Sequence, residues 1–251
     1  MSPESWIEEA ARAIAARPPL VALTGAGISV ESGIPPFRSP GGLWEKFDPT
    51  VYASIETFRR DPSKYWSIRG DFIRRLDDYA PNAGHLALAE LERAGLLRHL
   101  ITQNIDGLHQ KAGSRSVTEL HGNLREILCL ACNRRYLAPR IPPGTPPRCD
   151  DCGGVLKPNT VLFGEALPAE ALERAIQEAA TCGCLLVVGT SAVVQPAASL
   201  PRIARGNGAL VVEVNLERSP AGADLFLEGA AGVILPRLAA ALRDRREHPT
   251  A

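Results

Sequence analysis

The segment LVALTGAG, residues 20–27, decides the fold of this chain, because a short apolar run ends directly in a glycine-rich loop. The same order recurs further along the chain, where apolar runs lead into polar or small residues: 98–102 into 103–106, 184–188 into 189–191, and 209–214 into 215–217. Runs of this length and composition are typical of strands that are buried on both faces.

Helical patterns separate these runs. Residues 4–17, 85–94 and 169–180 carry apolar side chains at helical spacing. A fifth apolar run, residues 232–235, precedes the C-terminal helix, and we count it with the strands. Strands alternating with helices predict an α/β fold with a doubly wound parallel sheet. In such a sheet ligands bind outside the carboxyl ends of the strands, where the polar loops of this chain fall.

Two stretches interrupt the alternation. Residues 39–82 mix aromatic and charged residues and predict a helical insertion or cover. Residues 126–157 hold four paired cysteines and a proline-rich segment, and they predict a small inserted module. The main domain would then comprise residues 1–38, 83–125 and 158–251.

The paired cysteines form the pattern CxxC-x16-CxxC, at Cys129, Cys132, Cys149 and Cys152. Two residues between thiols allow both sulfurs to reach one tetrahedral ion, so the pattern predicts a zinc site; two redox pairs are the alternative. Four thiolates leave no position for a reactive water, so we expect the zinc to be structural. Cys182 and Cys184 begin an apolar run and are expected to be buried.

The loop at residues 24–29 has two interpretations. Glycines there would let backbone N–H groups approach a pyrophosphate at a helix N-terminus. An ordinary strand-to-helix turn fits equally well, because the third glycine of a GxGxxG motif is displaced to Gly33 and the ribose-binding acid is not evident.

The bulk composition excludes several classes of protein. Hydrophobic residues make up 45% of the chain and charged residues 22%, as in a globular protein with a large core. Lys plus Arg and Asp plus Glu both number 28, and this zero net charge argues against direct nucleic-acid binding. Without a membrane span or signal peptide in the sequence, we expect a cytoplasmic protein with no membrane partner. The oligomeric state stays open, a monomer included.

Several segments together resemble the signatures of the sirtuin family. The matching segments, in the family's order and with the CxxC pairs between them, are GAGIS at 25–29, GIPPFR at 33–38, TQNID at 102–106, LHGN at 120–123, FGE at 163–165, GTS at 189–191, PAA at 196–198 and VNL at 214–216. The resemblance covers roughly residues 5–240, and so many colinear motifs are far more specific than any one of them. The chain is similar to bacterial-type sirtuins.

The resemblance implies a Rossmann-like NAD-binding domain with a smaller domain built from the zinc module and the helical cover. It implies an NAD-dependent protein-lysine deacetylase or deacylase, with NAD and one structural zinc ion as cofactors and acyl-lysine proteins as partners. The acyl oxygen would attack the nicotinamide ribose, and the products would be nicotinamide, deacylated lysine and O-acyl-ADP-ribose.

The resemblance also implies a role for each matched residue. His121 would be the general base toward the ribose, and Asn104 would order the site near the ribose and a water. Val161, Phe163 and Gly164 would form an edge to which an extended peptide adds as a strand. Asp106 and Ile105 would bind the nicotinamide carboxamide. The whole cofactor-binding set would be Gly25, Ala26, Gly27, Phe37, Arg38, Gln103, Asn104, Ile105, Asp106, Gly189, Thr190, Ser191, Asn215, Leu216, Glu217 and Val233.

The acyl group is indicated by what the sequence lacks. Relatives that prefer succinyl or malonyl lysine resemble one another in a Tyr-x-x-Arg pair, which would grip the acyl carboxylate. Here Tyr65 and Arg69 are four apart, and they stand too early in the chain to match. We therefore expect acetyl or other uncharged acyl groups, because an acidic acyl would be left unpaired in an apolar channel.

Alternatives remain open from the sequence. Without the resemblance, His121 could be a structural hydrogen bonder and Arg38 with Asp106 a salt bridge. Within the family, mono-ADP-ribosyltransfer to a protein, or removal of succinyl or malonyl groups, would use the same cofactor. A non-enzymatic NAD-binding sensor is a further alternative, but His121 and Arg38 are both present and favour the enzyme.

Overall fold

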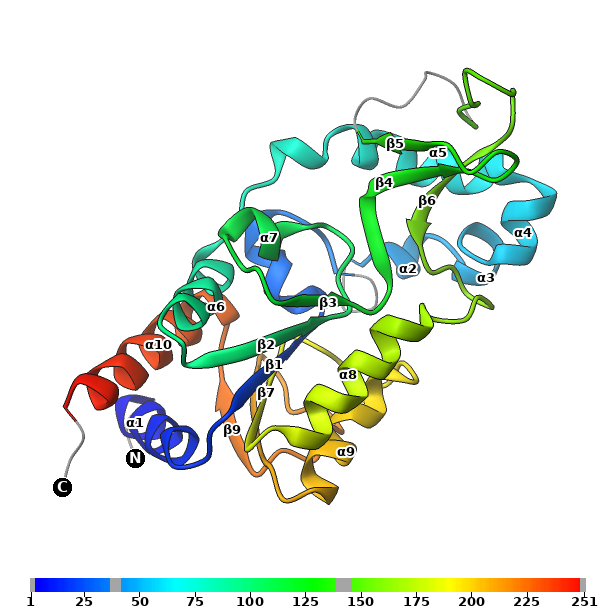
Figure 1. Cartoon of the computed structure of the whole chain (residues 1–251). Helices are drawn as coiled ribbons and strands as arrows, with labels where there is room; N and C mark the ends of the chain where they lie inside the picture. Colours follow the sequence, from blue (N-terminus) through cyan, green and yellow to red (C-terminus); the bar gives the residue numbers. More distant parts are fainter. Residues whose placement is uncertain (1–2, 37–41, 139–145, 249–251) are drawn as a thin grey trace.

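The structure is a computed structural model that describes residues 3–36, 42–138 and 146–248 (Figure 1). Its larger part is a six-stranded sheet in the order β3-β2-β1-β7-β8-β9, and all neighbouring strands in it are parallel. The strands are β1 (Leu20–Thr24), β2 (Leu97–Thr102), β3 (Val117–Glu119), β7 (Cys184–Val188), β8 (Leu210–Asn215) and β9 (Leu225–Glu228). The chain order reverses beside β1, so the predicted doubly wound sheet is confirmed.

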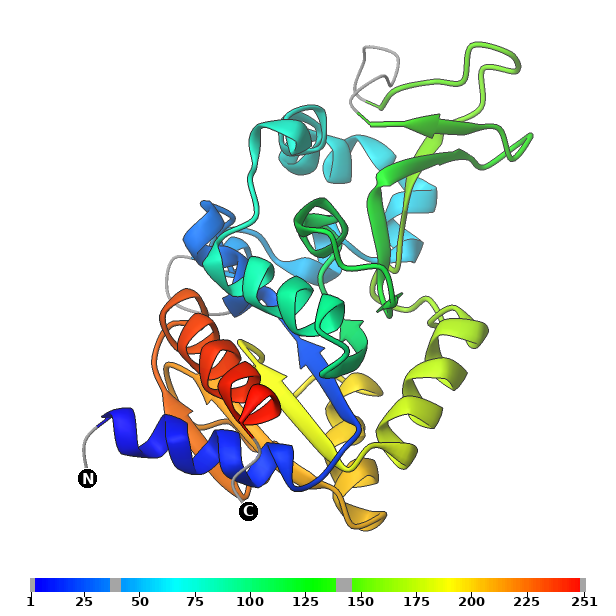
Figure 2. The ribbon, with the colours of Figure 1, turned by 60° about the vertical axis from the view of Figure 1, so that its left-hand side comes forward.

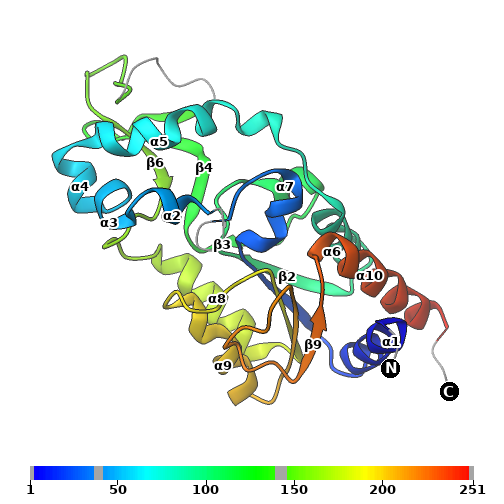
Figure 3. The same ribbon diagram turned by 180° about the vertical axis from the view of Figure 1, so that it is seen from behind.

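Helices cover both faces of this sheet (Figures 2 and 3). On one face lie α1 (Pro3–Ala15), α6 (Ala83–Arg93) and α10 (Ala231–Glu247); on the other lie α8 (Ala169–Thr181) and α9 (Leu200–Gly206). Successive side chains of a strand point to opposite faces. In β1, accordingly, Leu20 and Ala22 join the first cluster, while Val21 and Leu23 join the second.

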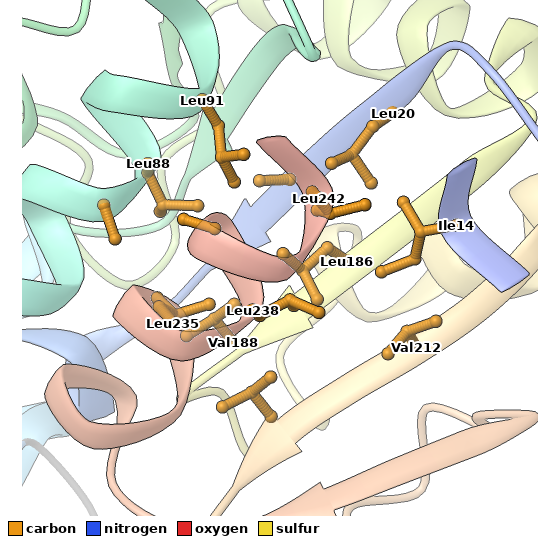
Figure 4. Packing of buried hydrophobic residues seen from close by; sticks show 14 of the residues in the cluster. Ile14, Leu20, Leu88, Leu91, Leu186, Val188, Val212, Leu235, Leu238 and Leu242 are labelled. Carbon is orange, nitrogen blue, oxygen red and sulfur yellow. The ribbon is translucent and has the colours of Figure 1, made fainter. Parts of the chain in front are cut away.

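The first cluster is a continuous hydrophobic core. Figure 4 shows how Leu235, Leu238 and Leu242 of α10 reach down to Leu186 and Val188 of β7. Leu88 and Leu91 of α6 and Ile14 of α1 complete the same layer. The helices predicted at residues 4–17, 85–94 and 169–180 are therefore confirmed, within a few residues at their ends.

The fifth predicted strand is wrong. Residues 232–235 belong to the first turns of α10. The buried residues continue at helical spacing through Ala231, Ile234, Leu235, Leu238 and Leu242, and a run of four apolar residues is too short to separate this period from that of a strand. In the six-stranded sheet, the strands missing from the prediction are the short edge strands β3 and β9.

A smaller part of the chain forms its own layer above the carboxyl ends of the strands. It holds an antiparallel sheet of β4 (Gly122–Cys129), β5 (Arg135–Leu137) and β6 (Leu156–Thr160) in the order β5-β4-β6. The helices α2 (Leu43–Lys46), α3 (Pro49–Tyr52), α4 (Ile55–Arg60) and α5 (Pro62–Arg74) accompany it. Phe58, Trp66 and Ile73 pack on Leu124 and Ile127 of β4.

The 3₁₀ helices η1 (Ala26–Ser32) and η2 (Leu76–Asp78) lie between the two parts along the chain. The 3₁₀ helix η3 (Ala197–Ser199) and the helix α7 (Leu108–Ala112) belong to the larger part. The chain leaves the large sheet at Gly122, which pairs with Thr160, where it returns. A Cβ on Gly122 would lie 2.1 Å from the carbonyl oxygen of Asn159, and its φ of 74° also favours glycine. None of the helices in the described part is long and apolar enough to cross a bilayer.

Candidate active site

One cavity of about 1080 Å³ lies where β1, β2, β7 and β8 end, beneath the smaller part. That volume is at the upper limit of the roughly 300–1,000 Å³ of most ligand pockets, so it has room for a large ligand. It brings together these predicted residues: Gly25, Ala26, Gly27, Gln103, Asn104, Ile105, His121, Val161, Phe163, Gly164, Gly189, Thr190, Ser191, Asn215, Leu216 and Glu217. Segments that are far apart in sequence thus meet at one place.

Four predicted cofactor residues are not among those that line this cavity. Phe37 and Arg38 lie outside the described residues. Val233 is 55% exposed and is not part of the cavity wall, where Ala230 and Ala231 stand instead. Asp106 lines a separate side pocket of about 30 Å³, together with Ser29, Ile34, Pro35, Phe72 and others.

The glycine-rich loop packs backbone against backbone. Gly25 N donates to the carbonyl of Val188 at 3.0 Å, and Gly27 N donates to that of Gly189 at 2.8 Å. A Cβ on Gly27 would lie 2.7 Å from Gly189 Cα, so only glycine fits there. The loop leads into the 3₁₀ helix η1 and not into an α-helix. The N–H groups of Gly25 and Gly27 are therefore engaged within the protein, and what the loop offers at the ends of two adjacent strands is backbone without side chains, which a ligand can approach closely.

Asn104 is held from several sides. It is 4% exposed, and its Nδ2 donates to Gly25 O and to Ser29 Oγ, each at 3.1 Å. Its backbone N–H donates to Thr102 Oγ1 at 3.0 Å. With both amide donors used inside the protein, Oδ1 is the side-chain atom that a ligand in the cavity can address.

Asp106 forms a polar wall of the side pocket. Its Oδ2 accepts from Ser29 Oγ at 2.8 Å, and its Oδ1 accepts from Leu108 N at 2.9 Å. Burial raises the pKa of this carboxyl, while the two hydrogen bonds oppose that shift. A carboxylate fixed by two donors keeps lone pairs for an amide ligand, which suits the predicted contact to a carboxamide.

His121 has the geometry of a base. Its Nδ1 lies 2.9 Å from the carbonyl oxygen of Gln103, which can only accept, so Nδ1 carries the proton and Nε2 keeps its lone pair. Burial lowers the pKa of His121, and the hydrogen bond to Gln103 opposes part of that shift. The ring is therefore neutral at pH 7 and able to accept a proton at the cavity wall.

Polar side chains connect the strand ends around the rest of the cavity. Gln103 Nε2 donates to Thr190 Oγ1 at 2.9 Å, and Asn215 Nδ2 donates to Thr190 O at 3.0 Å. The buried Glu213 accepts from Asn215 Nδ2 at 3.2 Å and from Ser219 N at 2.9 Å. These bonds fix the loops after β2, β7 and β8 relative to one another.

The predicted peptide edge is partly occupied by the protein itself. Val161 N donates to His121 O, Phe163 N donates to Ala53 O, and Phe163 O accepts from Ile55 N, each at 2.9 Å. Glu165 accepts from Leu162 N at 2.8 Å and pairs with Lys157 at 3.0 Å. The segment is thus held firmly along the cavity, which residues 194–196 also line.

Tyr65 and Arg69, which stand too early in the chain to match the Tyr-x-x-Arg pair, were not among the predicted site residues. Both line the cavity from α5. The Tyr65 hydroxyl is hydrogen-bonded to Thr160 and Arg69, and the Arg69 guanidinium lies 4.6 Å from the ring centroid of Phe72. Residues four apart lie on the same face of a helix, so the sequence already indicated that Tyr65 and Arg69 point in the same direction. Both groups are nevertheless engaged within the protein.

The four cysteines converge at the far end of the smaller part. Their sulfurs all lie within 4.8 Å of one another, with Cys129 and Cys152 at 3.5 Å and Cys132 and Cys149 at 3.7 Å. A tetrahedral zinc with Zn–S bonds of about 2.3 Å requires sulfurs about 3.8 Å apart, so the cluster fits the ion. None of the four lines the cavity, which agrees with a structural role.

Comparison with known proteins gives the same picture. The model of the Sir2 family matches residues 25–196. The chain is 49% identical over 227 residues to NAD-dependent protein deacylase 2 of Pyrobaculum aerophilum, covering 90% of this chain and 91% of the relative.

Solved structures agree over nearly the full length. A mutant Sir2 homologue in complex with ADP-ribose superposes with a TM-score of 0.91 at 44% identity, covering 97% of this chain and 99% of the other. A Sir2 protein bound to a myristoylated histone peptide gives a TM-score of 0.80 at 39% identity, with coverages of 97% and 99%. With its sheet, its strand-end loops and its four cysteines all in place, the chain belongs to the Sir2 family.

Proposed function

We propose that this protein removes acetyl or other uncharged acyl groups from lysine side chains of proteins in an NAD-dependent reaction, with nicotinamide and O-acyl-ADP-ribose as products. The observation that carries the proposal is the convergence of His121, Asn104 and the glycine-rich loop on one cavity. The NAD-dependent deacylase at 49% identity and the Sir2 complexes with ADP-ribose and with an acylated peptide support it.

When bound, NAD⁺ supplies a glycosidic bond to nicotinamide and an ADP-ribose that accepts the acyl group. We assign the backbone of Gly25 to Gly27 to the pyrophosphate, and Gln103 and Asn104 to the nicotinamide ribose. Asp106 and Ile105 hold the carboxamide, with Asp106 lining the side pocket. Ser191, Asn215 and their neighbours face the adenosine. Phe37 and Arg38 keep the roles predicted from the sequence.

The chain's own proton transfer occurs at His121. Its Nε2 accepts a proton from a ribose hydroxyl while Nδ1 stays bonded to Gln103 O, so the ring keeps its orientation as its charge changes. Asn104 presents Oδ1 to the ribose or to a water. The groove between residues 161–164 and 194–196 takes the substrate peptide in extended form, and the acyl group enters beside Tyr65.

We infer the acyl preference from the charged side chains at and near the cavity wall, which already have partners within the protein. Arg69 stacks over Phe72 and contacts Tyr65, and Lys157 pairs with Glu165. An acyl carboxylate would have to displace one of these partners, which favours uncharged acyl groups. We also propose that the protein acts in the cytoplasm on proteins and not on nucleic acid, that a monomer suffices, and that residues 39–82 and 126–157 form units separate from the NAD-binding domain.

The test is a mass assay with NAD⁺ and peptides carrying acetyl-, butyryl-, myristoyl- or succinyl-lysine. We expect release of nicotinamide together with loss of the acyl mass, for the uncharged groups above succinyl. Transfer of label from NAD⁺ onto protein without deacylation would instead indicate a mono-ADP-ribosyltransferase. Faster turnover of the succinyl peptide than of the acetyl peptide would contradict the assigned acyl class.

A further inference from the structure

A buried pair of hydroxyls lies directly below the loop that carries Asn104. Thr24 and Thr102 are the last residues of β1 and β2, and they are partners in register. Thr24 Oγ1 donates to Thr102 Oγ1 at 2.8 Å, and Thr102 Oγ1 accepts from Asn104 N at 3.0 Å. The two threonines are 0% and 2% exposed. Polar groups buried so completely at the ends of apolar strands require a reason.

His109 on α7 stands behind this pair. Its Nε2 lies 2.9 Å from Thr24 Oγ1, and its ring is 1% exposed and 4.9 Å from the ring of His85. Because the Thr24 proton points to Thr102, Nε2 of His109 must be the donor to Thr24. Nδ1 has no hydrogen-bond partner in the described part of the chain. The neutral ring therefore donates through Nε2 only. The hydrogen bonds run in one direction, from His109 to Thr24 and from Thr24 to Thr102.

None of these three residues lines either cavity. They act on the reaction through the residues that they hold, and the one held by a side-chain hydroxyl is Asn104, whose own side chain is anchored in the described part of the chain at Gly25 O and Ser29 Oγ. The hydrogen bond that the Asn104 N–H donates to Thr102 Oγ1 determines where the backbone of Asn104 lies, and hence where its side chain points.

From this geometry we propose that the relay His109–Thr24–Thr102 positions Asn104 for turnover, an inference that rests on the proposed deacylation. The relay is not needed to keep the loop attached, because Gln103 N donates to Thr24 O at 3.0 Å independently of either hydroxyl. Its loss lets Asn104 shift while the fold remains. A misplacement of about 1 Å can lower a rate by on the order of a hundredfold.

The chain offers a matched control. His99 Nε2 lies 2.8 Å from Thr118 Oγ1, a second buried histidine–threonine pair, on β2 and the neighbouring β3. Thr118→Val also removes one buried threonine hydroxyl with its hydrogen bond, but at a residue that does not line the cavity and does not contact Asn104. The conservative variant Thr102→Ser keeps the hydroxyl and loses only a methyl group.

The experiment compares these three variants with the unchanged enzyme in thermal unfolding, in NAD⁺ binding by calorimetry, and in steady-state deacylation of an acetyl-lysine peptide. We expect both Thr102→Val and Thr118→Val to lower the Tm. Thr102→Val should weaken NAD⁺ binding by less than about tenfold, because Asn104 is one of many residues that we assign to the cofactor. Only Thr102→Val should lower kcat, by roughly ten- to a hundredfold, with little change in KM. Thr102→Ser should recover most of the turnover.

The two proposals fail in different ways. If the unchanged enzyme releases no nicotinamide with any acyl peptide, the proposed function is overturned and the relay's role falls with it. If that enzyme is active and Thr102→Val turns over as fast as Thr118→Val, the relay is overturned alone. An equal loss of kcat in Thr102→Ser and Thr102→Val would also overturn it, because the hydroxyl would then not be the decisive group.

Discussion

At the scale of single residues, the role of His121 depends on one hydrogen bond. Gln103 O accepts from Nδ1 and so assigns the proton to one nitrogen and the lone pair to the other. The same Gln103 reaches Thr190 with its side chain. Gln103, which orients His121, is thereby hydrogen-bonded to the loop after β7. The orientation of His121 is therefore fixed relative to the sheet.

Replacement of His121 tests this assignment. His121→Ala should lower the rate of deacylation by roughly 10²- to 10⁴-fold, which is the usual contribution of general-base catalysis, because the alanine leaves no proton acceptor. NAD⁺ binding, measured by calorimetry, should persist. Gln110→Ala, an exposed change on α7, is the control and should retain full turnover. An active His121→Ala enzyme would remove this residue from the mechanism.

Residue by residue, the sequence predicts the cavity well where a loop follows a strand directly. Gln103 and Asn104 lie one and two positions after β2, so their placement follows from the strand itself. Tyr65 and Arg69 were missed because they come from a helix of the smaller part. Which face of α5 points to the cavity depends on how Trp66 and Ile73 pack against β4, and no local pattern encodes that packing.

At the scale of elements, the zinc module supports the cavity from a distance. Cys129 and Cys149 belong to the same hydrophobic cluster as Phe58, Tyr65 and Trp66. Trp66 Nε1 also donates to Leu156 O of β6 at 2.9 Å. The ion holds β4 and the segment before β6 together, and α5 packs on that layer with Tyr65 and Arg69 at the cavity.

Removal of the metal should therefore cost activity as well as stability. We expect a chelator, or Cys132→Ser, to lower the stability of the smaller part by at least about 3 kcal/mol, since structural zinc contributes folding free energy directly. Deacylation should be lost in parallel. The measurements are zinc content, thermal unfolding and turnover, with Cys182→Ala as the control that keeps one zinc per chain. A zinc-free protein with unchanged Tm and turnover would contradict a structural ion.

The strands also show why part of the fold could not be predicted from the sequence. Four of the five apolar runs became β1, β2, β7 and β8, because each ends in glycine or polar residues that stop it. Residues 232–235 lack such an end and continue into α10, where Pro236 is tolerated in the early helix. The edge strands β3 and β9 are short and only partly buried, so they leave no strong apolar run.

At the scale of the whole molecule, buried histidines make stability depend on pH. Burial lowers the pKa of His85 to about 4 and that of His109 well below 6.5, and it lowers those of His99 and His121 as well. The unfolded chain binds these protons near pH 6.5, before the folded chain does. Their contribution is thus complete above pH 6.5 and is lost as the pH falls toward 4. Burial raises the pKa of Asp106 and Glu119, which acts in the opposite sense.

We expect the free energy of unfolding to fall between pH 7 and pH 5 by about 2 kcal/mol for each histidine with a strongly lowered pKa. Chemical denaturation across this range measures the slope. His85→Gln should reduce the slope by about one proton. Stability that is constant from pH 7 to pH 5 would show that the rings are protonated in the folded protein.

The pairing of Gly122 with Thr160 has a consequence for how such chains can be altered. The strand that leaves the large sheet and the strand that returns to it are paired there. Residues 122–160, which hold the zinc site, are therefore joined to the large part through two neighbouring positions. The segment between these two positions can be lengthened, shortened or exchanged for its counterpart in a relative without changing the spacing of β1, β2, β7 and β8. A chimaera joined at Gly122 and Thr160 would keep the strand-end loops of one protein and acquire the zinc-binding segment of another.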